Sequence, residues 1–69
     1  MTQIVIMKVA ECSGFYYLTF YKNEFGITSK NYPKELFNGK KPKKYDLVDT
    51  ELKDGKLVLS FNGIVLSEN

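Results

Sequence analysis

Apolar and polar residues alternate most clearly in the C-terminal part of the chain, where two turn signals interrupt the pattern. Asp54-Gly55 and Asn62-Gly63 are typical of type I′ hairpin turns, because both central positions of such a turn need a positive φ. These turns predict four apolar cross-strand pairs: Leu52 with Leu57, Val48 with Phe61, Phe61 with Ile64, and Leu59 with Leu66. One face of residues 45–67 is then mostly apolar: Val48, Thr50, Leu52, Leu57, Leu59, Phe61, Ile64 and Leu66. The pattern predicts a three-stranded meander with one buried face and one mostly polar face, which includes Leu47, Val58 and Val65.

A second meander is expected over residues 3–30, with turns at Ser13-Gly14 and near Asn23-Glu24. In this register Val9 faces Leu18, and Phe20 faces both Met7 and Ile27. The inner face then carries Val5, Met7, Val9, Leu18, Phe20, Phe25 and Ile27. The opposite face is far more apolar and aromatic than a solvated sheet face: Ile4, Ile6, Lys8, Ala10, Cys12, Phe15, Tyr17, Thr19, Tyr21 and Thr28.

Residues 31–44 link the two meanders. Pro33 can open one helical turn at about residues 33–38, and Asn38-Gly39 can close it with a left-handed cap. Elsewhere no segment keeps apolar residues at helical spacing over ten positions. We therefore predict a single all-β domain over residues 1–69, a small six-stranded barrel or orthogonal sandwich of OB-like or SH3-like shape.

Charge is distributed unevenly along the 69 residues. The net charge is only +2, but five lysines and a single acid, Glu35, lie between Lys34 and Lys44. All ten cationic residues are lysines. This segment is therefore the basic part of the molecule, and a merely soluble loop is the plainest interpretation of it.

The inventory of reactive side chains argues against catalysis. Histidine is absent, so the commonest general base near neutral pH and the usual partner of a serine or cysteine nucleophile are missing. We expect Cys12 to be a small, buried or half-buried strand residue, and we expect no enzyme, cofactor or metal site. The apolar stretch from Ile4 to Met7 is too short for a membrane span and is followed by Lys8, so we expect a cytoplasmic protein. Frequent Lys, Asn, Ile, Phe and Tyr fit an AT-rich genome, such as that of a low-GC bacterium or its phages.

The aromatic face and the basic segment together suggest a binding function. Single-stranded nucleic acid is held by bases stacked on aromatic rings and by positive charge along the backbone. The candidate binding residues are Phe15, Tyr17, Tyr21, Lys8, Lys34, Lys40, Lys41, Lys43 and Lys44. Lysine contacts phosphate as a point charge, so we expect weak sequence selectivity. The predicted topology resembles the small single-stranded-DNA-binding β-barrels of filamentous phages and of cold-shock domains, a likeness of general shape.

Two other interpretations of the aromatic face stay open. It can bind a protein, either a host protein bound by a phage or plasmid factor or a second copy of this chain. Alternatively, the face is no binding site, because the register of these strands differs from the expected one or because the linking turn folds over the face with Leu36 and Phe37 and makes a second core.

Overall fold

The computed structural model describes residues 2–68, which form six antiparallel strands and one 3-10 turn. The elements are β1 (Thr2–Cys12), β2 (Phe15–Phe20), β3 (Ser29–Pro33), η1 (Lys34–Phe37), β4 (Leu47–Lys53), β5 (Lys56–Phe61) and β6 (Ile64–Glu68). The described part of the chain contains no α-helix. The predicted all-β fold of six strands in two meanders is confirmed.

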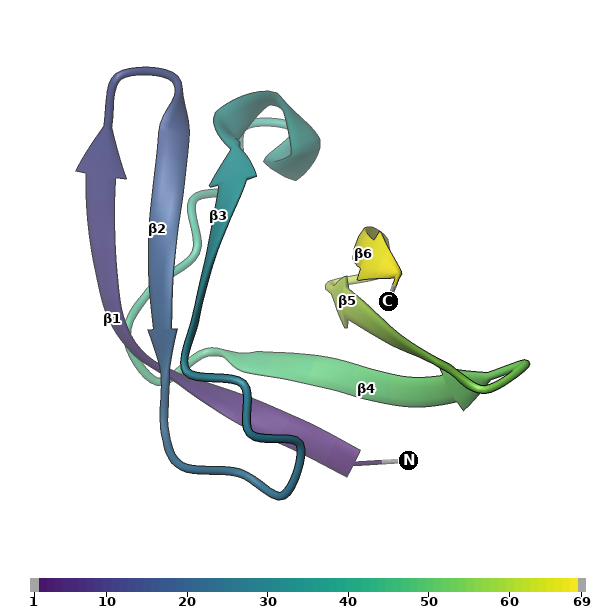
Figure 1. The fold of residues 1–69 in the computed structure, drawn as a ribbon. Helices are drawn as coiled ribbons and strands as arrows, with labels where there is room; N and C mark the ends of the chain where they lie inside the picture. Colours follow the sequence, from purple (N-terminus) through teal and green to yellow (C-terminus); the bar gives the residue numbers. More distant parts are fainter. Residues whose placement is uncertain (1, 69) are drawn as a thin grey trace.

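One sheet contains all six strands, in the order β3-β2-β1-β4-β5-β6. The long strand β1 joins the two meanders, because its first half pairs with β4 and its second half pairs with β2 (Figure 1). The two halves of the sheet therefore point in different directions and curl into a half-barrel of the small OB-like or SH3-like kind.

A β-bulge in β1 changes the expected pairing of the first two strands. Phe20 pairs with Ile6, not with Met7. The register shifts between Ile6 and Lys8, so Met7 is the extra residue and its side chain is exposed. Because side chains alternate along a strand, one extra residue exchanges the inward and outward sets on one side of the bulge.

The two sides of the bulge therefore differ in how well the sequence predicted them. On the far side, the predicted pair of Val9 and Leu18 is confirmed. On the N-terminal side, Ile4 and Ile6 are buried in the core, whereas Val5 is only partly buried. The prediction that Ile4 and Ile6 face outward was wrong because the sequence pattern was read without the bulge.

The third strand begins later than expected. The side chain of Asn23 organises the loop before it: its amide nitrogen donates to the carbonyls of Tyr21 and Ile27, and its oxygen accepts from the amides of Phe25 and Ile27. These bonds take the place of ladder bonds, so β3 starts at Ser29. Phe25 and Ile27 still pack against the core, but from the loop.

Both predicted type I′ turns of the C-terminal meander are confirmed. φ is 51° at Asp54 and 78° at Gly55, and it is 49° at Asn62 and 82° at Gly63. All four values lie in the left-handed region that this turn requires. The predicted Asn38-Gly39 cap is also left-handed, with φ of 49° and 81°.

The C-terminal registers follow the prediction near the turns and depart from it at one bulge. Two predicted pairs are confirmed: Leu52 with Leu57, and Phe61 with Ile64. Leu59 pairs with Ser67 and not with Leu66, because the register shifts between Leu59 and Ser60. Leu52 was expected on the buried face, but it lies near the tip of the hairpin and is 71% exposed.

The core lies on the concave side of the curled sheet and draws on both meanders. Its buried members are Ile4, Ile6, Leu18, Phe20, Tyr32, Phe37, Val48, Leu59, Phe61 and Leu66. Val58, expected on the polar face, is buried as well, whereas Leu47 and Val65 are exposed.

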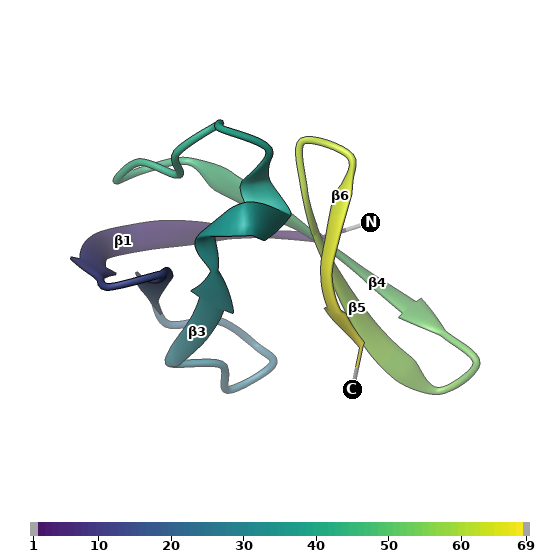
Figure 2. The same ribbon diagram turned by 90° about the horizontal axis from the view of Figure 1, so that it is seen from above.

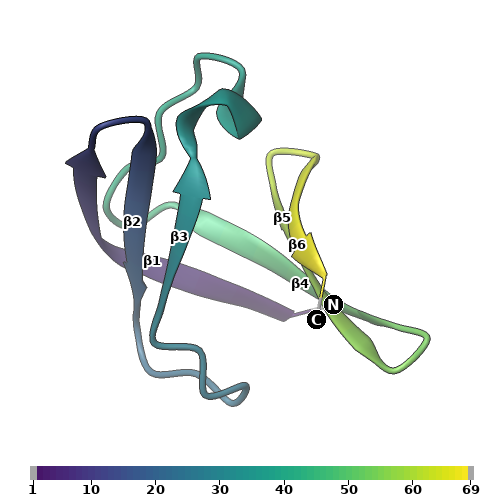
Figure 3. The ribbon, with the colours of Figure 1, turned by 45° about the horizontal axis from the view of Figure 1, so that its top comes forward.

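The linking turn covers the core rather than the outer aromatic face. Phe37 of η1 is only 1% exposed and meets Tyr16, Tyr32 and Phe61 edge to face, with ring centroids 5.3, 6.4 and 5.7 Å away. η1 lies between β3 and β6, where the curled sheet is open (Figures 2 and 3). Leu36 packs against the same core. The alternative in which Leu36 and Phe37 fold over the aromatic face was therefore wrong.

Candidate functional site

The strands β1, β2 and β3 present a common outer face, directed away from the core. Their registers form three rows across it: Cys12 with Phe15 and Pro33, Ala10 with Tyr17 and Asn31, and Lys8 with Thr19 and Ser29. Phe15 and Tyr17 are each 42% exposed. The Tyr17 hydroxyl donates a hydrogen bond to Ser29 Oγ at 2.8 Å, which fixes the direction of the ring. Both aromatic residues predicted on this part of the face are thus available to a partner.

Two further tyrosines extend the exposed aromatic surface past the end of β2. Tyr21 is 42% exposed, and its ring lies nearly parallel to that of Tyr45, with the planes 12° apart and the centroids 6.4 Å apart. Tyr45 is 61% exposed and was not among the predicted site residues. The only signal in the sequence is its place directly after the lysine run. We call Phe15, Tyr17, Tyr21 and Tyr45 the aromatic stripe.

The predicted lysines are not equivalent, because Glu11 of β1 forms ion pairs with two of them. Lys34 Nζ lies 2.8 Å from one carboxylate oxygen of Glu11, and Lys41 Nζ lies 2.8 Å from the other. Hydrogen bonds from Lys34 and then from Lys41 lower the pKa of Glu11 from its usual value of 4.5 to about 2. The same contact raises the pKa of Lys41. Lys34 also lies over the ring of Tyr16, 5.5 Å from its centroid.

Three other predicted lysines of the basic segment remain available. Lys40, Lys43 and Lys44 are exposed, and none of them forms an ion pair with another residue of the 2–68 range. Lys44 Nζ lies 5.0 Å from the centroid of the Tyr45 ring, so it joins the aromatic stripe. Lys8, also exposed, belongs to the outer face itself.

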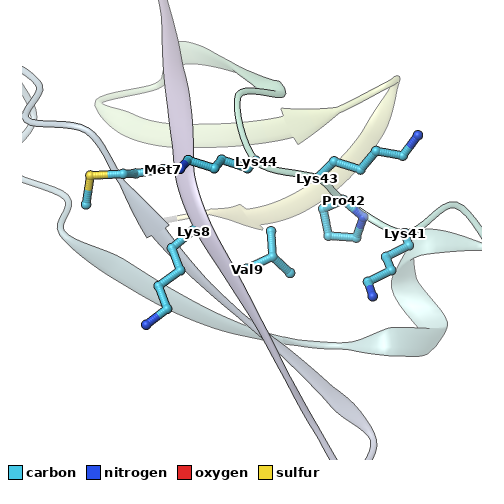
Figure 4. Close-up of a pocket in the computed structure, with 7 residues that line it drawn as sticks. All are labelled: Met7, Lys8, Val9, Lys41, Pro42, Lys43 and Lys44. Atoms are coloured by element: carbon cyan, nitrogen blue, oxygen red, sulfur yellow. The ribbon is translucent and has the colours of Figure 1, made fainter.

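An open groove runs between β1 and the basic segment (Figure 4). Its lining residues are Met7, Lys8, Val9, Lys41, Pro42, Lys43 and Lys44. Met7 and Lys8 project to one side of β1, whereas Val9 points to the other side, toward Pro42. Apolar side chains and lysines therefore line the groove together, and Lys44 connects it to the aromatic stripe through Tyr45.

Within residues 2–68, no three His, Cys, Asp or Glu side chains come together in a way that could hold a metal ion. Cys12 was expected to be buried or half-buried, but its thiol is free and exposed, because Cys12 ends β1 on the outer face. No helix between residues 2 and 68 has the length and apolar character needed to cross a membrane.

Comparison with models of protein families, with curated proteins and with solved structures gave no match to this chain.

Proposed function

We propose that this protein is a non-enzymatic module that binds single-stranded nucleic acid on its aromatic stripe. The observation that supports the proposal is the set of four aromatic rings exposed along one surface, with Lys44 over the last of them. Base stacking on a protein ring contributes ~1–3 kcal/mol per base and accepts every base. Polar residues are the normal occupants of a solvated sheet face, so exposed rings in this number call for a partner.

The proposal assigns phosphate contacts to fewer lysines than the composition suggested. Lys34 and Lys41 share Glu11 as their counter-charge, so together with it they offer an anion one net positive charge instead of two. Lys8, Lys43 and Lys44 border the groove next to the stripe and carry the electrostatic part. With no arginine in the chain to read guanine through two hydrogen bonds, binding discriminates little between sequences.

A second candidate function is supported by a different feature of the same surface. Met7 is 37% exposed and Leu47 is 48% exposed, and neither side chain offers an aromatic ring to a base. Apolar groups of this kind favour a protein surface, either a foreign partner or a second copy of this chain. In either function we place the protein in the cytoplasm, where the exposed thiol of Cys12 stays reduced.

Affinity for a labelled oligothymidylate, measured by fluorescence anisotropy at several salt concentrations, tests the proposal. With three phosphate contacts, a plot of the logarithm of the binding constant against the logarithm of the salt concentration has a slope of about −2, because each contact contributes ~0.7. Replacing Lys43 and Lys44 with Gln reduces that slope by about 1.4. The matched control replaces Lys53 and Lys56, which are exposed at the far β4–β5 hairpin, and keeps the wild-type slope.

The aromatic contribution is tested at Tyr17. Tyr17→Ala weakens oligonucleotide binding by ~1–3 kcal/mol, while Tyr17→Phe keeps the stacking ring and loses only the bond to Ser29. Wild-type affinity in a normally folded Tyr17→Ala protein would refute the proposed site. If the wild type binds no oligonucleotide, and Tyr17→Ala elutes from a size-exclusion column at a different volume from the wild type, the protein-binding function is favoured instead.

A further inference from the structure

Tyr21 and Tyr45 approach each other from opposite sides of β1. The amide of Tyr21 donates to the carbonyl of Val5 at 2.9 Å, and the amide of Tyr45 donates to the carbonyl of Ile6 at 2.6 Å. The two rings therefore meet across this strand, although they come from different meanders. Both remain substantially exposed, so their contact does not remove them from solvent.

The spacing of the two ring centroids is close to that of two rings stacked on one flat group. Stacked bases follow one another at about 3.4 Å along a strand, so a base between two rings separates their centroids by about 6.8 Å. The observed separation is 6.4 Å with the planes 12° from parallel.

Hydrogen bonds fix the backbone that carries both rings. Tyr45 has a φ of 76°, a left-handed conformation that a residue with a Cβ adopts at a cost and that is concentrated at functional sites. The turn that contains Tyr45 is fixed by two bonds, from the Asp46 amide to the Lys43 carbonyl and from the Lys43 amide to the Asp46 carboxylate. On the other side, the Asn23 side chain donates to the carbonyl of Tyr21.

Positive charge lies next to this pair of rings. Lys44 Nζ is 5.0 Å from the centroid of the Tyr45 ring, and Lys43 and Lys44 border the groove beside β1, whose volume is about 610 Å³ (Figure 4). A nucleotide whose base enters between the rings can thus place its phosphate against these two lysines. A neutral aromatic side chain of a protein partner carries no anionic group to pair with them.

We propose that Tyr21 and Tyr45 clamp one unpaired base of a single strand between their rings, with the adjoining phosphate on Lys43 and Lys44. This inference rests on the proposed function and makes it more specific, since it identifies the position at which a base is stacked on both faces. Phe15 and Tyr17 lie farther back along β2, away from the clamp. They receive neighbouring bases on one face of each ring only.

The experiment combines NMR of the complex with affinity measurements on variants, using a short oligothymidylate as the probe. The H6 proton of a single thymine shows nuclear Overhauser effects to ring protons of both Tyr21 and Tyr45. Tyr21→Ala and Tyr45→Ala each weaken binding by about 5- to 150-fold, the range expected for the loss of one stacked contact. Tyr45→Phe keeps the affinity because it keeps the ring, and Leu47→Ala is the control for removal of an exposed apolar group beside the clamp.

The outcomes separate this inference from the proposed function. Oligothymidylate that binds with contacts to Phe15 and Tyr17, while Tyr21→Ala and Tyr45→Ala bind as tightly as the wild type, overturns the clamp alone. A wild-type protein that binds no oligonucleotide even at low salt overturns both. Thymine protons that reach only one of the two tyrosines also overturn the clamp, because a sandwiched base contacts both rings.

Discussion

The ring of Phe37 meets the ring of Phe61 edge to face, with the centroids 5.7 Å apart. Phe37 belongs to η1 in the linking segment, and Phe61 ends β5 of the C-terminal meander. The sheet order leaves β3 and β6 at its two ends, so this contact joins the halves where no strand pairing does. It also directs the linking segment to the concave side and so leaves the aromatic stripe uncovered.

Phe37→Ala is expected to lower the free energy of unfolding by ~3–5 kcal/mol, because it empties a fully buried site among three other rings. Urea denaturation followed by far-UV circular dichroism measures the loss. If the variant does not fold, Phe37→Leu retains most of the volume and gives a smaller, measurable loss. Leu52→Ala, at a position 71% exposed, is the control. A loss below about 1 kcal/mol for Phe37→Ala would show that η1 does not close the core.

The bulge in β1 gives a second prediction about stability. Ile6→Ala removes a fully buried side chain and should cost ~2–5 kcal/mol, whereas Met7→Ala removes an exposed one and should cost less than about 1 kcal/mol. The uninterrupted alternation of the sequence implies the opposite order. Denaturation curves of the two variants therefore decide between the bulged and the uninterrupted register.

Local signals made much of this fold predictable. Dipeptides such as Asn62-Gly63 mark turns through their own backbone preferences, and the alternation beside them then sets the registers of short hairpins. The bulge at Met7 has no such signal, because it arises where one strand must pair with β2 along one half and with β4 along the other. Its position depends on tertiary pairing, which a pattern along a single strand does not contain.

The candidate site was predictable to a similar degree. Phe15, Tyr17 and Tyr21 stand out because they are aromatic residues on a face that should be polar. Tyr45 was missed, since its place beside Tyr21 depends on a bond to Ile6 across β1 and on a left-handed backbone. The composition of the basic segment also gives no reason to distinguish its lysines. In the part of the chain that the structure describes, Glu11 of β1 forms ion pairs with Lys34 and Lys41 alone.

A third prediction concerns the turn between β5 and β6. Gly63 has a φ of 82°, and a Cβ added there would meet nothing within 4 Å, so only backbone strain opposes a larger residue. Gly63→Val should therefore destabilise the protein by ~1–2 kcal/mol, the cost of a left-handed residue with a Cβ. Gly63→Asn should cost less, because asparagine tolerates this conformation. Equal stability of all three proteins in thermal or urea denaturation would contradict the type I′ turn.

The last prediction concerns the dependence of stability on pH through Glu11. Its pKa is about 2 in the folded protein against a usual value of 4.5, because Lys34 and Lys41 donate hydrogen bonds to its charged form. A lowered pKa means that the ionised carboxylate stabilises the folded state above pH 4.5, and that this contribution is lost as the pH falls through about 2.

Glu11→Gln should accordingly be less stable than the wild type near pH 6, and the difference should shrink steadily between pH 4.5 and 2. Because the ion pairs are solvent-exposed, about 1 M salt should reduce the same difference at pH 6. Urea denaturation at a series of pH values measures it. Glu51→Gln is the matched control, since Glu51 is exposed and forms no ion pair with any residue in the 2–68 range. A Glu11→Gln difference that stays constant from pH 6 to 2 would mean that the carboxylate charge does not hold the basic segment to β1, and Lys34 and Lys41 would then be as free to meet phosphate as Lys43 and Lys44.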